Sequence, residues 1–201
     1  MSPFVCIDAI IGGIIAYGSL GWNHAVTCTG RNLFYRKTLF EGIKGFSGIN
    51  KILMGDDDLL MMKVKKQSKW KIMFMPDASG AVLSDASKGF RQYISQRSRH
   101  IAASKYFPIT VKMGFGITLF SKLFIMLLLI ILILGYEISF LSINLVILTF
   151  FFTFLFCTIM CIRIKQTSII LFYPLWEIYY ILSQFIIGPL GFFGRITWDK
   201  R

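Results

Sequence analysis

Two long apolar runs dominate the second half of the chain, at residues 117–136 and 141–162. A helix needs about 20 apolar residues to cross a hydrocarbon core of roughly 30 Å, so each run predicts a transmembrane helix. The link Glu137–Phe140 lacks lysine and arginine, whereas Arg163 and Lys165 follow the second run. The positive-inside bias therefore predicts a helical hairpin that enters from the cytoplasm and returns to it.

A third apolar segment, residues 169–193, is less regular. It contains residues that disturb a simple span, namely Pro174, Glu177, Gly188 and Pro189. The tail that follows is basic, so a full crossing would place that charge outside the cytoplasm. The segment is either re-entrant, interfacial, or a crossing that breaks the charge bias. Lys122 is expected near the entry end of the first span, where it could extend to the interface.

The first half of the chain alternates short apolar and polar stretches. Residues Phe4–Trp22 are apolar, but Asp8 and several glycines interrupt them, which favours a buried helix and turn within a larger domain over a span. Short β-rich runs predict strands near Val26, at Lys71–Met75 and at Ala81–Leu83.

Helices are predicted at Leu39–Ile43, at Leu59–Lys66 and, with an amphipathic pattern, from Ser87 to about Tyr106. The fold class expected is α/β plus membrane helices. Residues 1–108 would form a polar domain, and residues 109–201 a membrane domain with two or three transmembrane or re-entrant helices.

Composition agrees with a membrane protein: 55% of the 201 residues are hydrophobic and the mean hydropathy is +0.65. The net charge is +12, mostly in residues 1–112. A basic domain joined to spans predicts a multi-pass protein of the cell (inner) membrane, with membrane lipids as partners and its polar part in the cytoplasm. No nucleic-acid partner is expected, because no binding motif is present. The four cysteines show no zinc-ligand spacing.

Two polar clusters carry the candidate chemistry. The acidic cluster, Gly55–Asp58, holds three adjacent carboxylates that are either a solvated helix start or a site that uses negative charge. In the basic cluster, Gln96–His100, a helix would place Gln96, Arg99 and His100 on one face. That face could bind an anionic group or lie against lipid headgroups. If the clusters act together, Asp57 and Arg99 must face a common cleft.

Four segments and the spans after them resemble the C-terminal half of membrane-bound family-2 glycosyltransferases. In chain order these segments are Thr27–Lys37, Gly45–Phe46, Gly55–Leu60 and Gln96–His100. The resemblance covers essentially the whole chain. It implies the acceptor-side part of a GT-A fold, an α/β nucleotide-sugar domain, with transmembrane helices after it.

The resemblance also implies roles for individual residues. The family's acidic motif falls on Asp56 and Asp57, with Asp57 as the general base that takes the proton of an acceptor hydroxyl. The family's Gln-x-x-Arg-Trp motif falls on the basic cluster, with histidine in place of tryptophan. The residues implied in acceptor or diphosphate binding are Gln96, Arg97, Arg99, His100, Gly30 and Asn32.

One family feature is missing. The family uses Mg²⁺ or Mn²⁺ held by an Asp-x-Asp motif in its donor half, and no such motif precedes Val26 here. The chain is therefore expected to be a fragment without a metal site, for which a separate donor-domain polypeptide is a candidate partner. The expected reaction is an inverting transfer of a sugar from a nucleotide-sugar donor to a lipid-linked or polysaccharide acceptor at the cytoplasmic membrane face. The alternative is a catalytically inactive, truncated membrane protein or adaptor.

Overall fold

The computed structural model describes residues 3–50, 52, 54–82, 84–85, 89–135 and 139–194. Helices form the regular structure of these residues. In chain order they are α1 Pro3–Gly21, η1 Gly30–Asn32, α2 Lys37–Gly42, α3 Asp56–Gln67, η2 Ala78–Gly80, α4 Phe90–Ala103, η3 Ser104–Tyr106, α5 Ile109–Ile133, α6 Phe140–Arg163, η4 Thr167–Phe172 and α7 Tyr173–Phe193.

The predicted α/β, GT-A-type domain is wrong, because the described residues contain no β-strand. The segments near Val26 and at Lys71–Met75 are irregular, and so are Ala81 and Val82, whereas Leu83 lies outside the described residues. A strand needs a neighbouring strand to satisfy its backbone groups. Around Val26 these donors find carboxylates instead: the N–H groups of Cys28 and Gly30 bind side chains at the start of α3.

Several helices of the polar half were predicted correctly. Helix α3 carries all three aspartates in its first turn, where the helix dipole favours negative charge. Helix α4 covers most of the predicted amphipathic segment but ends at Ala103, whereas the predicted start at Ser87 lies outside the described residues. Helix α2, Lys37–Gly42, corresponds to the short helix predicted at Leu39–Ile43 but begins two residues earlier and ends one residue earlier.

Among the described residues, four helical segments are long and apolar enough to cross a membrane: α1, α5, α6 and the combined η4–α7 segment Thr167–Phe193. The protein is therefore a multi-pass membrane protein. The two firm spans of the sequence are confirmed as helices, although α5 begins at Ile109, well before residue 117. Helix α1 is an additional candidate, because the segment predicted as a buried helix is also long and apolar enough to span.

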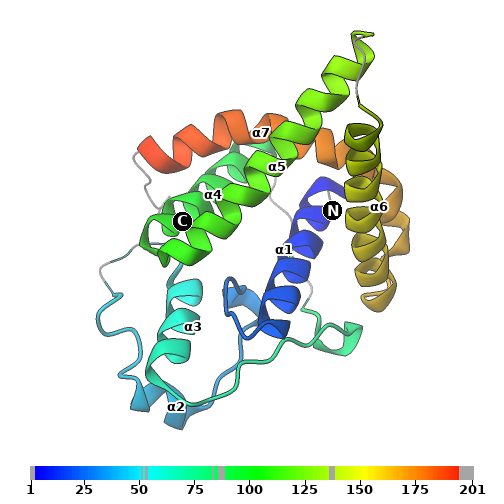
Figure 1. Cartoon of the computed structure of the whole chain (residues 1–201). Helices are drawn as coiled ribbons and strands as arrows, with labels where there is room; N and C mark the ends of the chain where they lie inside the picture. The colour runs from blue at the N-terminus through cyan, green and yellow to red at the C-terminus, as the bar shows by residue number, and fades with distance from the viewer. Residues whose placement is uncertain are drawn as a thin grey trace.

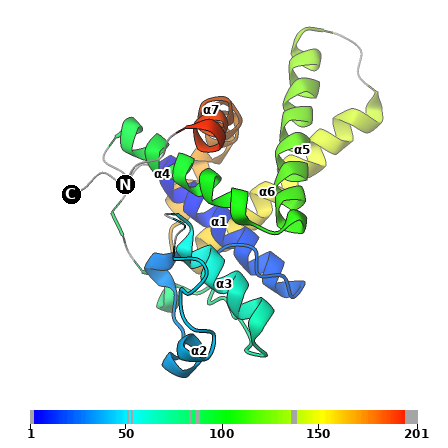
Figure 2. The same ribbon diagram turned by 90° about the vertical axis from the view of Figure 1, so that its left-hand side faces the viewer.

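The helices do not form a parallel bundle. Helix α7 lies crosswise to α6 (Figure 1) and packs against α4, which crosses it (Figure 2). Helices α2 and α3 lie at the end of the molecule opposite the end where α5 terminates (Figures 1 and 2). The largest core joins α1, α6 and the start of α7 through seven buried residues: Ile7, Ile10, Cys157, Met160, Cys161, Tyr173 and Trp176.

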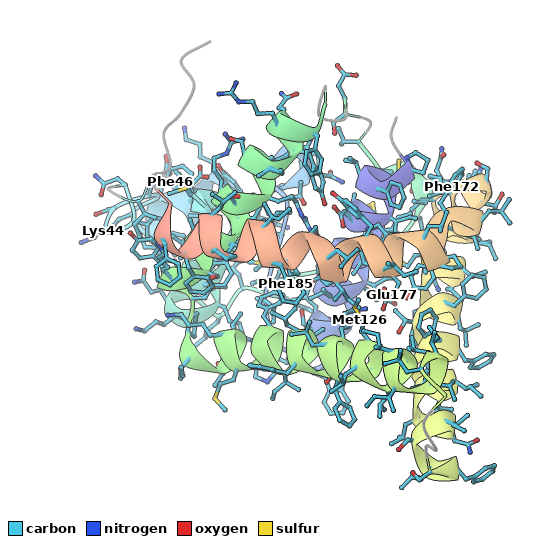
Figure 3. The ribbon with its side chains drawn as sticks, turned by 90° about the horizontal axis from the view of Figure 1, so that it is seen from above. Lys44, Phe46, Met126, Phe172, Glu177 and Phe185 are labelled. Carbon is cyan, nitrogen blue, oxygen red and sulfur yellow. The ribbon has the colours of Figure 1, made fainter. Side chains whose placement is uncertain are left out.

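Lys122 does not extend to the interface as predicted. Because α5 begins at Ile109, Lys122 lies near the middle of the helix, and its side chain is only 14% exposed. It forms an ion pair with Glu177 of α7, a carboxylate that Tyr173 also approaches. Figure 3 shows Glu177 between α7 and α5, close to Met126, which lines the same small cavity. An ionised group at this depth needs such a partner.

Candidate functional site

Gly55 sets the close contact between the two clusters. It precedes α3 in the left-handed conformation (φ 69°), and a Cβ at this position would lie 2.5 Å from the Cβ of Ala103. Only glycine combines this backbone angle with the space that α4 leaves. The start of α3 can therefore approach the end of α4, the helix that carries the basic cluster.

The three aspartates have three different environments. Asp58 is buried, and its Oδ1 accepts hydrogen bonds from the Cys28 N–H (2.8 Å) and the Thr27 hydroxyl (3.1 Å). Burial raises the pKa of Asp58 to about 6, and the charge of Asp57 adds to this effect. Burial and the nearby aspartates also raise the pKa of the Cys28 thiol, which keeps it neutral. Asp58 thus holds Thr27 and Cys28, in the segment before η1, against the first turn of α3.

Asp57 is half-buried and oriented by backbone donors. Its Oδ2 accepts a hydrogen bond of 2.6 Å from the Gly30 N–H, and its Oδ1 accepts one of 3.0 Å from the Asp58 N–H. Asp56 is exposed at the start of the helix. Of the acidic cluster, Asp57 therefore combines a fixed carboxylate orientation with access to solvent.

The structure brings the acidic and basic clusters together. A pocket of about 170 Å³, which we call the α3–α4 pocket, lies between the two helices. It is lined by Met54, Gly55, Asp56, Asp57, Gln96, Arg99 and His100. Asp57 and Arg99 thus face a common cleft, although 42 positions of sequence separate them. Five of the residues nominated from the sequence meet here.

His100 adds a polar group of variable charge to this pocket. The protein atoms that crowd its imidazole lower its pKa, and the charges of Arg97 and Arg99 lower it further, against the opposing effect of Asp57. Since the ordinary pKa of histidine is about 6.5, a lowered value leaves the ring mostly neutral at pH 7. The fixed positive charge of the pocket therefore belongs to Arg99.

The remaining nominated residues lie outside the pocket lining. Gly30 contacts it indirectly, through the hydrogen bond to Asp57. Asn32 donates its amide to the carbonyl of Gly80 (2.8 Å), which ties η1 to η2. Arg97 is directed to another element: its guanidinium lies 3.5 Å from Oδ1 of Asp8 on α1.

Asp8 is a polar residue that the sequence reasoning did not assign to the site. It is buried in α1, and Trp176 of α7 and Tyr93 of α4 both donate hydrogen bonds to its carboxylate. The available signal was a single carboxylate inside an apolar helix. Such a charge is costly to bury unless it has partners, so its presence predicts a polar network, but not which residues form it.

The resemblance implies Mg²⁺ or Mn²⁺, and the described residues do not fit such an ion. They contain no group of three or more His, Cys, Asp or Glu side chains that could hold a metal. The aspartates also diverge, since Asp58 binds Thr27 and Cys28 while Asp57 binds Gly30. Divalent cations of this kind need several convergent oxygen ligands. The roles below are therefore those of the chain's own side chains.

The α3–α4 pocket combines a proton acceptor with groups that bind anions. The carboxylates of Asp56 and Asp57 can accept protons, and the Arg99 guanidinium can hold a phosphate through charge-assisted hydrogen bonds. Comparison with known proteins gives no match, whether to a protein family, a curated protein or a solved structure.

Proposed function

We propose that this membrane protein takes part in transferring a sugar from a nucleotide-sugar donor to a lipid-linked or polysaccharide acceptor. The observation that carries the proposal is the α3–α4 pocket, in which the Asp57 carboxylate and the Arg99 guanidinium share one cavity. The order of the motifs in the sequence independently nominates Asp57 as the base and Arg99 as the residue that binds the diphosphate.

The proposed step is an inverting displacement. The acceptor hydroxyl oxygen attacks the anomeric carbon while its proton passes to the carboxylate of Asp57. The bond between the anomeric carbon and the diphosphate oxygen breaks, and its electron pair leaves with the nucleoside diphosphate. Arg99, assisted by the amide of Gln96, stabilises the negative charge that develops on that leaving group. A positioned general base contributes about 10²–10⁴ to the rate.

The membrane geometry suits a reaction at the cytoplasmic face. The polar elements α2 and α3 lie opposite the end of α5 (Figures 1 and 2), and the positive-inside bias favours a cytoplasmic location for the basic half of the chain. Helix α4 packs against the candidate span α7. A pocket on α4 would thus lie near the bilayer, within reach of a membrane-linked acceptor.

The test uses the full chain in lipid nanodiscs, with Mg²⁺ or Mn²⁺ in the buffer. Calorimetry measures binding of UDP and GDP, and labelled UDP- and GDP-sugars report transfer to a lipid extract or polysaccharide. We expect Asp57→Asn to reduce transfer by about 10²–10⁴ with nucleotide binding retained. We expect Arg99→Gln to weaken nucleotide binding.

Matched controls are Asp77→Asn and Arg91→Gln, because both residues are exposed and neither lines the pocket. Both controls should retain binding and transfer. Transfer that survives Asp57→Asn would contradict the base assignment. A wild-type chain that binds neither UDP nor GDP would overturn the function and favour the inactive adaptor.

A further inference from the structure

Asp8 joins three helices that are distant in sequence. Its carboxylate, 7% exposed on α1, accepts a hydrogen bond from the Tyr93 hydroxyl of α4 and one of 2.9 Å from Nε1 of Trp176 on α7. The guanidinium of Arg97, also on α4, lies 3.5 Å from the same carboxylate. A buried carboxylate with this many partners is strongly fixed, because each partner offsets part of the cost of burying its charge.

Both α4 partners of Asp8 lie on one face of the helix. Tyr93 and Arg97 are four residues apart, so their side chains project from the same side. The pocket residues Gln96 and His100 repeat this spacing on the neighbouring face. Holding the first face toward α1 therefore fixes the rotation at which the second face meets the acidic cluster.

Helix α7 limits the movement of α4 from another side. A Cβ on Gly191 would lie 2.6 Å from Cβ of Ile101 and 2.9 Å from the backbone oxygen of Ser98. This close packing holds the backbone of α4 against α7, but steric contact of this kind does not by itself fix the rotation of a helix. The polar contacts of Asp8 supply the directional restraint.

We propose that Asp8 is a positioning residue for the α3–α4 pocket: by holding Tyr93 and Arg97, it sets the rotation of α4 that presents Gln96, Arg99 and His100 to Asp57. Trp176 of the membrane helix α7 donates a hydrogen bond to the same carboxylate, so the position of α7 also depends on Asp8. The effect of Asp8 on nucleotide binding and transfer rests on the proposed function, whereas its effect on the rotation of α4 does not.

The test compares Asp8→Asn with Asp8→Glu in the full chain in nanodiscs. The matched control is Glu177→Gln, which also removes a buried carboxylate but one whose partners, Lys122 and Tyr173, lie on α5 and α7. Spin labels attached through p-acetylphenylalanine at the exposed positions Arg91 and Lys66 report the distance between α4 and α3. The second readout is the affinity for UDP and the KM for the donor sugar.

We expect Asp8→Asn to shift the spin-label distance and to weaken UDP binding by about 10-fold to 100-fold. Asp8→Glu should restore both values in part, and Glu177→Gln should leave both at the wild-type value even where it lowers thermal stability. An unchanged distance in Asp8→Asn would overturn the positioning role. If the distance shifts but the wild type binds no nucleotide, the positioning role stands and the proposed function fails.

Discussion

The backbone N–H of Gly30 donates a hydrogen bond of 2.6 Å to Oδ2 of Asp57. This contact joins two residues that the sequence nominated separately, and it orients the carboxylate toward the α3–α4 pocket. Because the donor is the backbone N–H, a substitution at position 30 does not remove it. An added side chain can, however, displace the Asp57 carboxylate that accepts the hydrogen bond.

Gly30→Ala should reduce transfer more than it reduces stability. A Cβ at this position would lie 3.1 Å from Oδ2 and 3.3 Å from Cβ of Asp57, so the carboxylate must shift by a few tenths of an ångström. We expect a clear fall in kcat with a change of about 1 kcal/mol or less in the free energy of unfolding. Gly12→Ala is the control, since nothing lies within 4 Å of its added Cβ. Equal kcat values for the two variants would contradict the prediction.

Gly55→Ala should destabilise the protein through two effects. The positive φ strains a residue with a side chain, and the new Cβ would lie 2.5 Å from that of Ala103. We expect a loss of about 2–4 kcal/mol in the free energy of unfolding. Gly48→Ala separates the effects, because Gly48 also has a positive φ (85°) but open space around it. The smaller loss should be found at Gly48, by denaturant titration in detergent.

Asp58 should make stability depend on pH below neutrality. Its folded-state pKa of about 6 lies above the ordinary 3.8, so the folded protein binds more protons than the unfolded chain between these values. The free energy of unfolding should therefore fall as pH rises from about 4 to 6, by at most ~3 kcal/mol from this residue. Below about pH 4 Asp58 is protonated in both the folded and the unfolded state, so it costs no stability. Above about pH 6 the full cost of burying its charge is present.

Asp58→Asn tests this dependence. The amide oxygen can still accept the hydrogen bonds of Cys28 and Thr27 but does not titrate. The difference in stability between the wild type and the Asp58→Asn variant should change between about pH 4 and 6 and stay flat above about 7. A difference that is constant over the whole range would show that Asp58 titrates normally.

Removing one partner of the Lys122–Glu177 pair should cost more than removing both. Lys122→Met alone leaves the Glu177 carboxylate buried without its cation, and Glu177→Leu alone leaves the Lys122 ammonium buried without its anion. We expect each single variant to lose about 3–5 kcal/mol in the free energy of unfolding. The double variant Lys122→Met with Glu177→Leu should recover much of that loss, because apolar side chains suit the α5–α7 contact. Additive losses in a double-mutant cycle would argue against a direct interaction.

Parts of the site could be predicted because their signals are local. The three aspartates at the start of α3 reflect the helix dipole, and the spacing of Gln96, Arg99 and His100 reflects the helical period. These two patterns, with the order of motifs, were enough to nominate the residues of one pocket. The role of Arg97 could not be read in this way, because its partner Asp8 lies on a helix far earlier in the chain.

The sequence by itself determined that this is a multi-pass membrane protein, roughly where two of its spans lie and which polar residues could do chemistry, since hydropathy and helical spacing are properties of neighbouring residues. Only the tertiary structure decided that the polar half is helical among the described residues, and that Lys122 pairs with Glu177. It also decided that Asp8 holds α4. The physical reason is that extended segments become strands, and buried charges become tolerable, only through partners supplied by distant parts of the chain.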